Sequence, residues 1–521
     1  MELSAYDRVP YPSHTYPQTH PDRLATVATL FGMNPAPVEH CRVLELGCGA
    51  GGNLVSFAFD LKQSDFIGVD LASLPISEGN ALIAELGLKN ITLSQVDLRE
   101  LSKDLGEFDY IIAHGLYSWV PKPAQDRILA ICETHLAKQG VAYISYNAYP
   151  GGHLREISRE MMRFHTSDIL EPKERLEQSR TVIRWAAEAQ YETDTYATWL
   201  REFDKRLQKR SDGSFYHDDI AEINTPVYFR HFAKHAAEHG LQFLSEADFF
   251  ETENYGEFPP EVRAHLDQMA RDNLLAKEQY LDFLNGRSFR QTLLCRHEVA
   301  LDRPVTPERI KGLYVKSSAL PTSGTPDIKS KSVEEFRTKK DAAATTDLPL
   351  AKAALLYLGE IHPRGIRFEE LTTRARELAG KSEQNNGDDA QTLAEVILRS
   401  FSAGVVELHL HEPIFSVEAG TFPLASPLAR WQGRRGDVVT TLLHESIRVA
   451  DNLALQLIQL LDGTRDREAL IRELSSLMEA NIQSPQTAAV SAAGKESLLR
   501  AIPQQLEQKL AELGKLGLLL A

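Results

Sequence analysis

The chain has 521 residues, of which 43% are hydrophobic and 25% are charged, and its formal net charge at pH 7 is -16. Length and composition predict a globular protein of two to four domains, at about 100–200 residues each. The acidic balance argues against nucleic acid or an anionic membrane as the default partner, because no run of Lys and Arg offsets it. Neither a secretory signal nor about 18 consecutive apolar residues occurs, so we expect a soluble cytoplasmic protein.

The cysteines are widely spaced apart from the first two, and they form neither a CxxC pair nor a zinc-binding spacing. We expect reduced, buried, structural thiols. They are Cys41, Cys48, Cys132 and Cys295.

From Arg42 onward, short β-rich runs alternate with segments whose apolar residues recur at helical spacing. This alternation predicts an α/β fold with a doubly wound, Rossmann-like sheet of parallel strands connected by helices. Ligands bind such sheets beyond the carboxyl ends of the strands, and polar residues or glycines end each run here. The first five predicted strands are Arg42–Leu46, Asp65–Asp70, Ile91–Asp97, Phe108–Gly115 and Gly140–Asn147.

Two later β-rich runs, His239–Ala247 and Phe289–Arg296, each follow a helical segment that ends in glycine. We predict that they complete a seven-stranded sheet within a domain of residues 1–300. Residues 150–225 contain amphipathic stretches rich in Arg and Glu, which predict a helical insertion over the strand ends. The alternative is a charged helical bundle with only a structural role.

The stretch Arg42–Leu54 contains GxGxxG, a pattern that fits both dinucleotide-binding turns and the glycine turn that binds S-adenosylmethionine. Asp70 suits either cofactor, because both present ribose hydroxyls. Glu45 lies in the strand before the glycines, where a carboxylate would repel a pyrophosphate but suit a cationic amino group. Asp97 follows the third β-rich run, where an acid can accept a hydrogen bond from an adenine amino group. The combination favours S-adenosylmethionine over NAD.

The sequence ELGCGAG, followed by an acid at the ends of the next two strands, resembles the class I S-adenosylmethionine-dependent methyltransferases. The resemblance implies that the glycine turn and its glutamate surround the methionine part of the cofactor. It also implies that Asp70 binds the ribose and that Asp97 and Leu98 frame the adenine. The predicted cofactor-binding residues are Tyr11, Tyr16, Glu45, Gly47, Cys48, Gly49, Gly51, Asn53, Asp70, Leu71, Asp97, Leu98 and His114.

The likeness extends to the segments AHGLYSWVP, SYNAYPGG and YLDFLNGRSFRQTLLC, and to the Tyr- and Pro-rich N-terminus. These segments resemble bacterial proteins in which a methyltransferase domain is followed by a methyltransferase regulatory domain. That group includes the rickettsial lysine methyltransferases of outer-membrane proteins. The resemblance implies protein lysine N-methylation as one activity of the group.

The N-terminal segment YDRVPYPSHTYP shows no helical period before Asp22. We predict an extended lid over the cofactor, with Tyr11 and Tyr16 as contacts. A plain surface arm is the alternative.

Methyl transfer from a sulfonium to an amine needs a neutral nucleophile and alignment, with little acid–base catalysis. A lysine amine must first lose its proton, which desolvation among aromatic rings favours, and aromatic faces attract the sulfonium and the methylated ammonium. The ends of the fourth and fifth strands carry such groups. The candidate active-site residues are His114, Tyr117, Trp119, Tyr146, Asn147 and Tyr149. The alternative for Trp119 and Tyr149 is packing against the first helix of the insertion.

The fourth strand is not followed by the Asn/Asp-Pro-Pro-Tyr quartet with which nucleic-acid amino-methyltransferases hold a flipped base, so no nucleic-acid partner is expected. His231, His235 and His239 lie one helical turn apart and could in principle hold a metal. No carboxylate or thiol partner is evident nearby, and histidines near a helix C-terminus are favourable without a metal. We therefore predict no metal site.

Residues 301–349 are rich in Pro, Ser, Thr and Lys, which predicts a connector or small hairpin region. Residues 350–521 contain helical segments, with a strand VVELHLHEP after the third, and predict a mainly helical, winged-helix-like domain. Such geometry invites a DNA-binding interpretation, but these segments carry many acids and few clustered cations. We favour docking of a substrate protein or dimerisation.

The sequence thus predicts a methyltransferase that uses S-adenosylmethionine and methylates a protein side chain, with lysine favoured. The expected partner is a protein substrate, with a homodimer left open and no membrane partner. Two alternatives stay open: a small-molecule methyltransferase, and an interaction protein that binds the cofactor without turnover.

Overall fold

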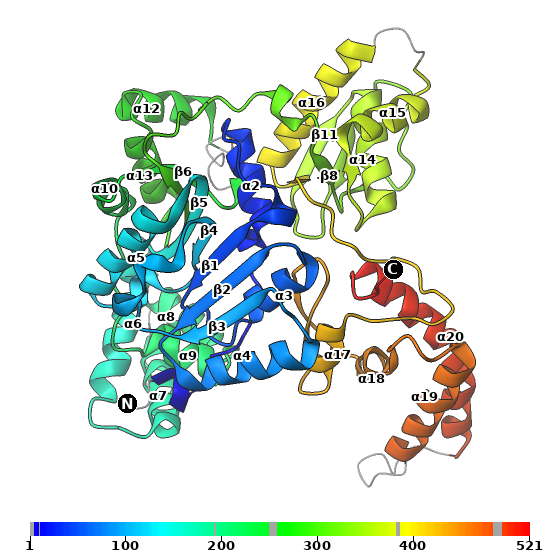
Figure 1. Cartoon of the computed structure of the whole chain (residues 1–521), viewed down its shortest axis with the longest axis horizontal. Coiled ribbons are helices and arrows are strands. Elements are labelled where there is room, and N and C mark those ends of the chain that lie inside the picture. The colour runs from blue at the N-terminus through cyan, green and yellow to red at the C-terminus, as the bar shows by residue number, and fades with distance from the viewer. Residues whose placement is uncertain are drawn as a thin grey trace.

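The computed structural model describes residues 5–9, 11–191, 194–249, 258–381, 386–482 and 492–520. At its centre is a seven-stranded sheet in the order β3-β2-β1-β4-β5-β7-β6 (Figure 1). The first five strands are parallel, and β7 is antiparallel to both of its neighbours. The strands are β1 (Arg42–Leu46), β2 (Asp65–Asp70), β3 (Ile91–Gln95), β4 (Phe108–Ala113), β5 (Leu136–Asn147), β6 (Leu241–Glu246) and β7 (Phe289–Arg296). The predicted Rossmann-like fold class is confirmed.

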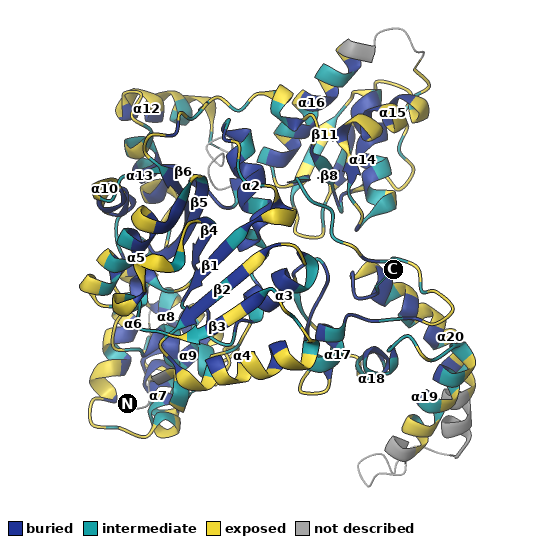
Figure 2. Ribbon diagram, viewed as in Figure 1, coloured by how far each residue is buried: buried dark blue, intermediate teal, exposed yellow. Residues whose placement is uncertain are grey.

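Helices cover both faces of the sheet, and the central strands are therefore buried on both sides (Figure 2). Successive side chains of β5 alternate between two apolar cores, with Tyr143 in one and Ile144 in the other. The first core includes side chains of α2 (Pro21–Leu30), α3 (Gly52–Asp60) and α4 (Ser73–Leu86). The second includes side chains of α5 (Lys122–His135) and α10 (Phe229–Glu238).

Between β5 and β6 the chain forms the helical insertion that the sequence predicted, with a small core of its own around Met162, Ile183 and Phe215. Its helices are α6 (Gly152–His165), α7 (Pro172–Glu188), α8 (Thr195–Leu207) and α9 (Asp212–Asp219). Two more helices, α12 (Pro260–Ala270) and α13 (Leu274–Asn285), connect β6 to β7. Short helical turns are α1 (Ala5–Arg8), η1 (Pro17–Thr19), η2 (Val38–His40), η3 (Leu98–Glu100), η4 (Lys103–Leu105), η5 (Tyr117–Trp119) and η7 (Pro307–Ile310).

A buried ion cluster joins the antiparallel edge of the sheet to α13. The Arg290 side chain is fully buried, and its guanidinium lies 2.6 Å from Glu246 Oε1, 3.0 Å from Glu278 Oε2 and 2.8 Å from Asp282 Oδ1. These residues come from β7, β6 and α13. The cluster therefore fixes that helix to the sheet by paired charges rather than by apolar contact alone.

The part of the chain after β7 builds small sheets and three helices. In one sheet β8 (Tyr314–Lys316) lies between β12 (Ile366–Arg367) and β13 (Glu407–His409), all antiparallel. The helices are those predicted, α14 (Pro349–Ile361), α15 (Phe368–Leu378) and α16 (Asn386–Ser402). A second sheet consists of β9 (Leu320–Pro321), β10 (Glu334–Arg337) and β11 (Ala343–Thr346), and β10 and β11 form a hairpin.

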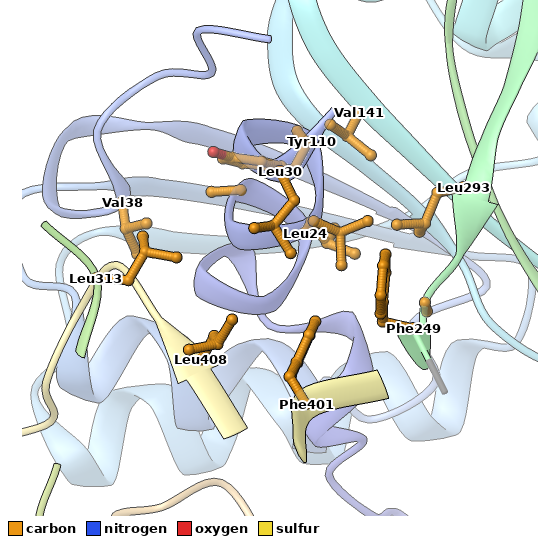
Figure 3. Packing of buried hydrophobic residues seen from close by; sticks show 14 of the residues in the cluster. Leu24, Leu30, Val38, Tyr110, Val141, Phe249, Leu293, Leu313, Phe401 and Leu408 are labelled. Carbon is orange, nitrogen blue, oxygen red and sulfur yellow. The ribbon is translucent and has the colours of Figure 1, made fainter. Parts of the chain in front are cut away.

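This part shares its apolar core with the methyltransferase-like sheet. Leu24 and Leu30 of α2 lie between Tyr110 and Val141 of the sheet on one side and Leu408 of β13 on the other (Figure 3). Leu313, Phe401 and Phe249 complete the contact, and the rings of Phe249 and Phe401 stack with centroids 4.9 Å apart. One continuous core thus extends from the sheet into the part after β7.

The C-terminal part has a separate core around Leu457, Leu470, Leu506 and Leu519. Its elements are α17 (Pro427–Gly433), β14 (Val438–Thr440), β15 (Ser446–Arg448), α18 (Asn452–Leu460), α19 (Arg467–Ile482) and α20 (Ala492–Lys515). The sequence did not predict the β14–β15 hairpin. Among the described helices, none is both long and apolar enough to cross a membrane.

Histidines at the end of β13 hold this part of the chain against the sheet domain. His409 Nδ1 lies 2.6 Å from Asp22 Oδ2, and the backbone amides of the next two residues donate to Asp22 Oδ1. His411 lies between Glu39 and Asp60, at 2.9 and 3.0 Å. We call these contacts the histidine clasp.

Candidate functional site

The glycine turn after β1 adopts a conformation that only glycine adopts at low cost. Gly47, Gly49 and Gly51 all have positive φ, at 74, 55 and 70°. A Cβ atom at Gly49 would meet nothing within 4 Å, so the turn is open at that point. The turn leads into the N-terminus of α3, where backbone N–H groups favour negatively charged groups.

The end of β2 is fixed to this turn through Asp70. Its Oδ2 accepts from the Gly49 amide at 2.8 Å, and its Oδ1 accepts from the Ala72 amide at 2.8 Å. Burial raises the pKa of Asp70. The next residue, Leu71, is 56% exposed. The Asp70 carboxylate is therefore oriented by the backbone on both sides of the strand end.

After β3, the Asp97 carboxylate, which we predicted to contact the adenine, is paired with a neighbouring arginine. Both of its carboxylate oxygens accept from the Arg99 guanidinium, and Asp97 also caps η3. The Arg99 guanidinium lowers the pKa of Asp97. Leu98 packs at the border of the second core. The neighbouring arginine, which the sequence prediction did not weigh, thus engages the Asp97 carboxylate.

Glu45 is buried within β1, directly before the glycine turn. Its Oε1 accepts from Asn53 Nδ2 at 3.0 Å, and Asn53 also holds Thr19 and the Tyr16 amide. Its Oε2 is buried and has no hydrogen-bond partner among the described residues. Burial raises the pKa of Glu45 to about 8. A buried acceptor without a partner is costly, which marks this oxygen as the place for a donor from a ligand.

The N-terminal segment spans from these strand ends to α9 of the insertion. The Tyr6 ring stacks on His217 with centroids 4.0 Å apart, and the Tyr11 hydroxyl donates to Asp218 Oδ1 at 3.4 Å. Burial raises the pKa of Tyr6 to about 12, with smaller contributions from the carboxylates of Asp70 and Asp218. Both carboxylates therefore lie close enough to affect the same phenol.

Tyr16 and His114 meet at the end of β4. Their rings lie 3.8 Å apart, and burial raises the pKa of Tyr16 to about 12, with Glu45 and then Asp218 adding to the rise. Burial lowers the pKa of His114 to about 4, so its ring is neutral at physiological pH.

A hydrogen-bond chain fixes the tautomer of His114. The hydroxyl of Tyr143 donates to Gln291 Oε1 at 2.8 Å, and this oxygen also accepts from Gln18 Nε2 at 2.8 Å. The Tyr143 hydroxyl has only one proton, so it accepts from His114 Nδ1 at 2.9 Å. The lone pair of the neutral ring therefore lies on Nε2. Sequence reasoning missed Tyr143, although it shares strand parity with Asn147.

Several predicted active-site residues point into the core instead. Tyr117 donates to or accepts from His235 Nδ1 at 2.8 Å, and Tyr146 shares a 3.0 Å hydrogen bond with Thr292 Oγ1. Both tyrosine rings pack on Phe232. For Tyr146 the reason is strand parity, because it points to the same side of β5 as Ile144, toward the face covered by α5 and α10.

The remaining candidates contact the insertion. The Asn147 amide donates to Asn224 Oδ1 at 2.7 Å. The Tyr149 hydroxyl donates to Glu156 Oε1 at 2.6 Å, and Trp119 lies under the guanidinium groups of α6. Trp119 and Tyr149 therefore pack against the first helix of the insertion, which was the alternative stated for them.

The three histidines of α10 and its C-terminal end have neighbours that the sequence alone did not reveal. His231 lies against Tyr228, with ring centroids 5.7 Å apart, whereas His235 and His239 both reach Asp126 of α5. The carboxylate partner that the sequence did not reveal therefore comes from another helix.

Family models match three parts of the chain: a methyltransferase domain at residues 43–140, a predicted methyltransferase regulatory domain at 211–296, and the PKMT C-terminal winged helix domain at 422–518. The uncharacterized protein RP789 of Rickettsia prowazekii (strain Madrid E) is 32% identical over 486 residues, which cover 91% of this chain and 86% of RP789. PKMT2 from Rickettsia typhi in complex with AdoHcy is 28% identical, with a TM-score of 0.85 over 98% of this chain and 100% of that chain. A second structure of that protein gives a TM-score of 0.86 at 26% identity.

Proposed function

We propose that this chain methylates lysine side chains of a protein substrate. It belongs to the family of S-adenosylmethionine-dependent methyltransferases that carry a methyltransferase regulatory domain and a PKMT winged helix domain. The match to the PKMT winged helix domain and the likeness to PKMT2 along 98% of the chain support a protein lysine as acceptor. The observation that carries the site assignment is the buried, unpartnered Oε2 of Glu45.

The donor set around Glu45 fits the cofactor. When bound, S-adenosylmethionine supplies an electrophilic methyl group on its sulfonium. We assign Glu45 Oε2 to the cationic amino group of the cofactor, which would favour the ionised carboxylate and offset the burial that raises its pKa. The open glycine turn at Gly49 leaves room beside it, and Asp70 is assigned to the ribose. A pyrophosphate would meet the Glu45 charge unfavourably.

The other predicted contacts take supporting positions in this proposal. Leu71 and Leu98 flank the adenine, with Asp97 sharing its carboxylate between Arg99 and the base. Cys48 and Gly51 continue the glycine turn. We assign these two residues, together with Leu71, Asp97 and Leu98, to the cofactor because of their place beside β2 and β3. Gly47, which has a positive φ, opens the turn, and Asn53 holds Glu45 in position.

We place the lysine amine between the N-terminal segment and α9. Asp218, held by Tyr11 and by Arg210 at 3.2 Å, attracts the ammonium, and the phenols of Tyr6 and Tyr16 surround the methylated product. Asp218 and Asp70 both raise the pKa of Tyr6, so both carboxylates lie near this phenol, and this supports a location beside the cofactor. His114 Nε2 offers a lone pair that accepts an N–H of the neutral amine and so orients its nitrogen.

The test is transfer of labelled methyl groups from S-adenosylmethionine to lysate proteins, with binding of the cofactor and of NAD followed by calorimetry. We expect label on lysine and binding of S-adenosylmethionine alone. Glu45→Gln removes the charge and should weaken cofactor binding by about 10- to 100-fold, since hydrogen bonds to charged groups contribute about 1.5–3 kcal/mol. The matched control is Glu78→Gln on the exposed face of α4, which should bind normally.

The outcomes separate the alternatives. Label only in small molecules would support a small-molecule methyltransferase, and cofactor binding without any labelled product would support an interaction protein. Undiminished affinity in Glu45→Gln would contradict the assignment of the glycine turn.

A further inference from the structure

Two helices on the same face of the sheet bring together a set of metal-ligating side chains. His235 and His239 lie one turn apart at the C-terminal end of α10, and Asp126 lies opposite them on α5. The Nε2 atoms of the two histidines lie 3.3 and 3.2 Å from the same oxygen, Asp126 Oδ1. All three ligand atoms lie within 4.8 Å of one another.

The other ring nitrogens are held so that Nε2 is free to coordinate. His239 Nδ1 lies 3.1 Å from Glu133 Oε2, and a carboxylate accepts from N–H, so a neutral ring that keeps this hydrogen bond has its lone pair on Nε2. His235 Nδ1 lies 2.8 Å from the Tyr117 hydroxyl, which can accept in the same way. Carboxylate and hydroxyl groups behind a histidine ring are the usual supports of a metal ligand.

A cation between His239 Nε2 and Asp126 Oδ1 would take the place of a ring proton on Nε2 and pair with the carboxylate. A tetrahedral ion bound at about 2.0–2.1 Å to each ligand separates its ligand atoms by about 3.3 Å, which matches the two distances to Asp126. The Asp126 side chain is 61% exposed, so a water molecule has access to the fourth position. Two imidazoles, one carboxylate and one water form a ligand set that suits Zn²⁺.

A second group of potential ligands fails the same test. His20, Asp60 and His444 also lie within 4.8 Å of one another. His20 Nδ1 accepts from the Asp22 amide at 3.1 Å, however, so the neutral ring carries its proton on Nε2 and presents no lone pair to the other two. Asp60 is already paired with His411. This group belongs to the contact between domains and offers no metal site.

We propose that Asp126, His235 and His239 bind one Zn²⁺ ion, with Glu133 and Tyr117 orienting the histidines. Asp126 belongs to the part matched by the methyltransferase domain, and the two histidines belong to the part matched by the regulatory domain. The ion would therefore fasten one part to the other, at a place separate from the glycine turn. The site does not depend on the nature of the methyl acceptor.

The experiment uses the full-length chain after removal of metals with a chelator. Zn²⁺ is titrated by calorimetry, and Co²⁺ is added separately, because a tetrahedral Co²⁺ site absorbs visible light. We expect one equivalent of metal at this site, a rise in melting temperature with Zn²⁺, and a visible Co²⁺ spectrum. His239→Gln should lose that equivalent and that spectrum. Its control is His231→Gln on the same helix, because His231 lies against Tyr228, and this variant should keep both.

Three results would overturn the proposal. They are no stoichiometric binding to the original chain, equal binding to the original chain and His239→Gln, and loss of binding in His231→Gln. Because His239 is only partly buried at the end of α10, its variant should fold, which a circular dichroism spectrum like that of the original chain would verify.

Discussion

Asp218, the residue to which we assign the attraction of the lysine ammonium, belongs to no sequence motif that points to this role. It lies on α9, far along the chain from the strand ends, and reaches the site only because the N-terminal segment runs between them. The predicted candidates all lay in the last residues of β5 or in the segments that follow β4 and β5. A period of two along β5 could have excluded Tyr146, because it has the parity of Ile144, but nothing local points to Asp218.

Replacement of that carboxylate should affect the acceptor and leave the cofactor alone. We expect Asp218→Asn to lower kcat/KM for methyl transfer by about 10- to 100-fold, because it removes the charge that attracts the ammonium. Binding of S-adenosylmethionine, measured by calorimetry, should stay unchanged. Asp212→Asn on the same helix is the control, since the Asp212 side chain is 74% exposed and pairs only with Arg180 among the described residues. An equal loss of cofactor affinity in Asp218→Asn would contradict the assignment.

Among the elements, the strands of the central sheet and β13 were predicted from the sequence, and the β14–β15 hairpin was not. Each parallel strand is a β-rich run that a polar residue or a glycine ends or closely follows, and burial on both faces makes such runs nearly continuous in apolar residues. The run that forms β14 and β15 is short and partly exposed, and its turn at His444 has a positive φ without a glycine to signal it. Position in the tertiary structure, rather than local pattern, produces this hairpin.

The junction between β7 and α13 depends on buried charge, which predicts a large cost for breaking it. Arg290→Met would leave Glu246, Glu278 and Asp282 without their shared cation and should lower the free energy of unfolding by about 3–5 kcal/mol. Urea denaturation followed by circular dichroism measures this. Arg472→Met, which breaks only an exposed pair with Glu468, should cost less than about 1 kcal/mol. Equal free energies of unfolding for Arg290→Met and Arg472→Met would mean that the buried cluster stabilises the fold no more than an exposed ion pair does.

At the scale of the whole molecule, the histidine clasp makes the contact between domains sensitive to pH. Burial lowers the pKa of His411, but Asp60 and Glu39 outweigh it and raise this pKa to about 9. The folded pKa lies above the unfolded value of about 6.5, so the clasp is fully stabilising below about pH 6.5. Its contribution, about 3 kcal/mol at most, is lost as the pH rises through 9.

The difference in unfolding free energy between the original chain and His411→Asn isolates this effect. We expect the difference to be largest at pH 6 and to shrink by about 3 kcal/mol by pH 10. His297→Asn, which alters a histidine whose side chain is 71% exposed, should show no such trend. A difference for His411→Asn that does not vary with pH would show that the histidine is not charged in the clasp.

The core that α2 shares with β13 and α16 has a consequence for how such a chain could have been assembled from parts. A recombination breakpoint near residue 300 would separate Leu24 and Leu30 from Leu408 and Phe401 and leave both fragments with uncovered apolar faces. A breakpoint near residue 413 keeps these contacts and leaves the core around Leu457 whole, and among the described residues it removes only Leu428 and Trp431 from the first core. Exchange of the last hundred or so residues is thus the substitution that disturbs the apolar cores least.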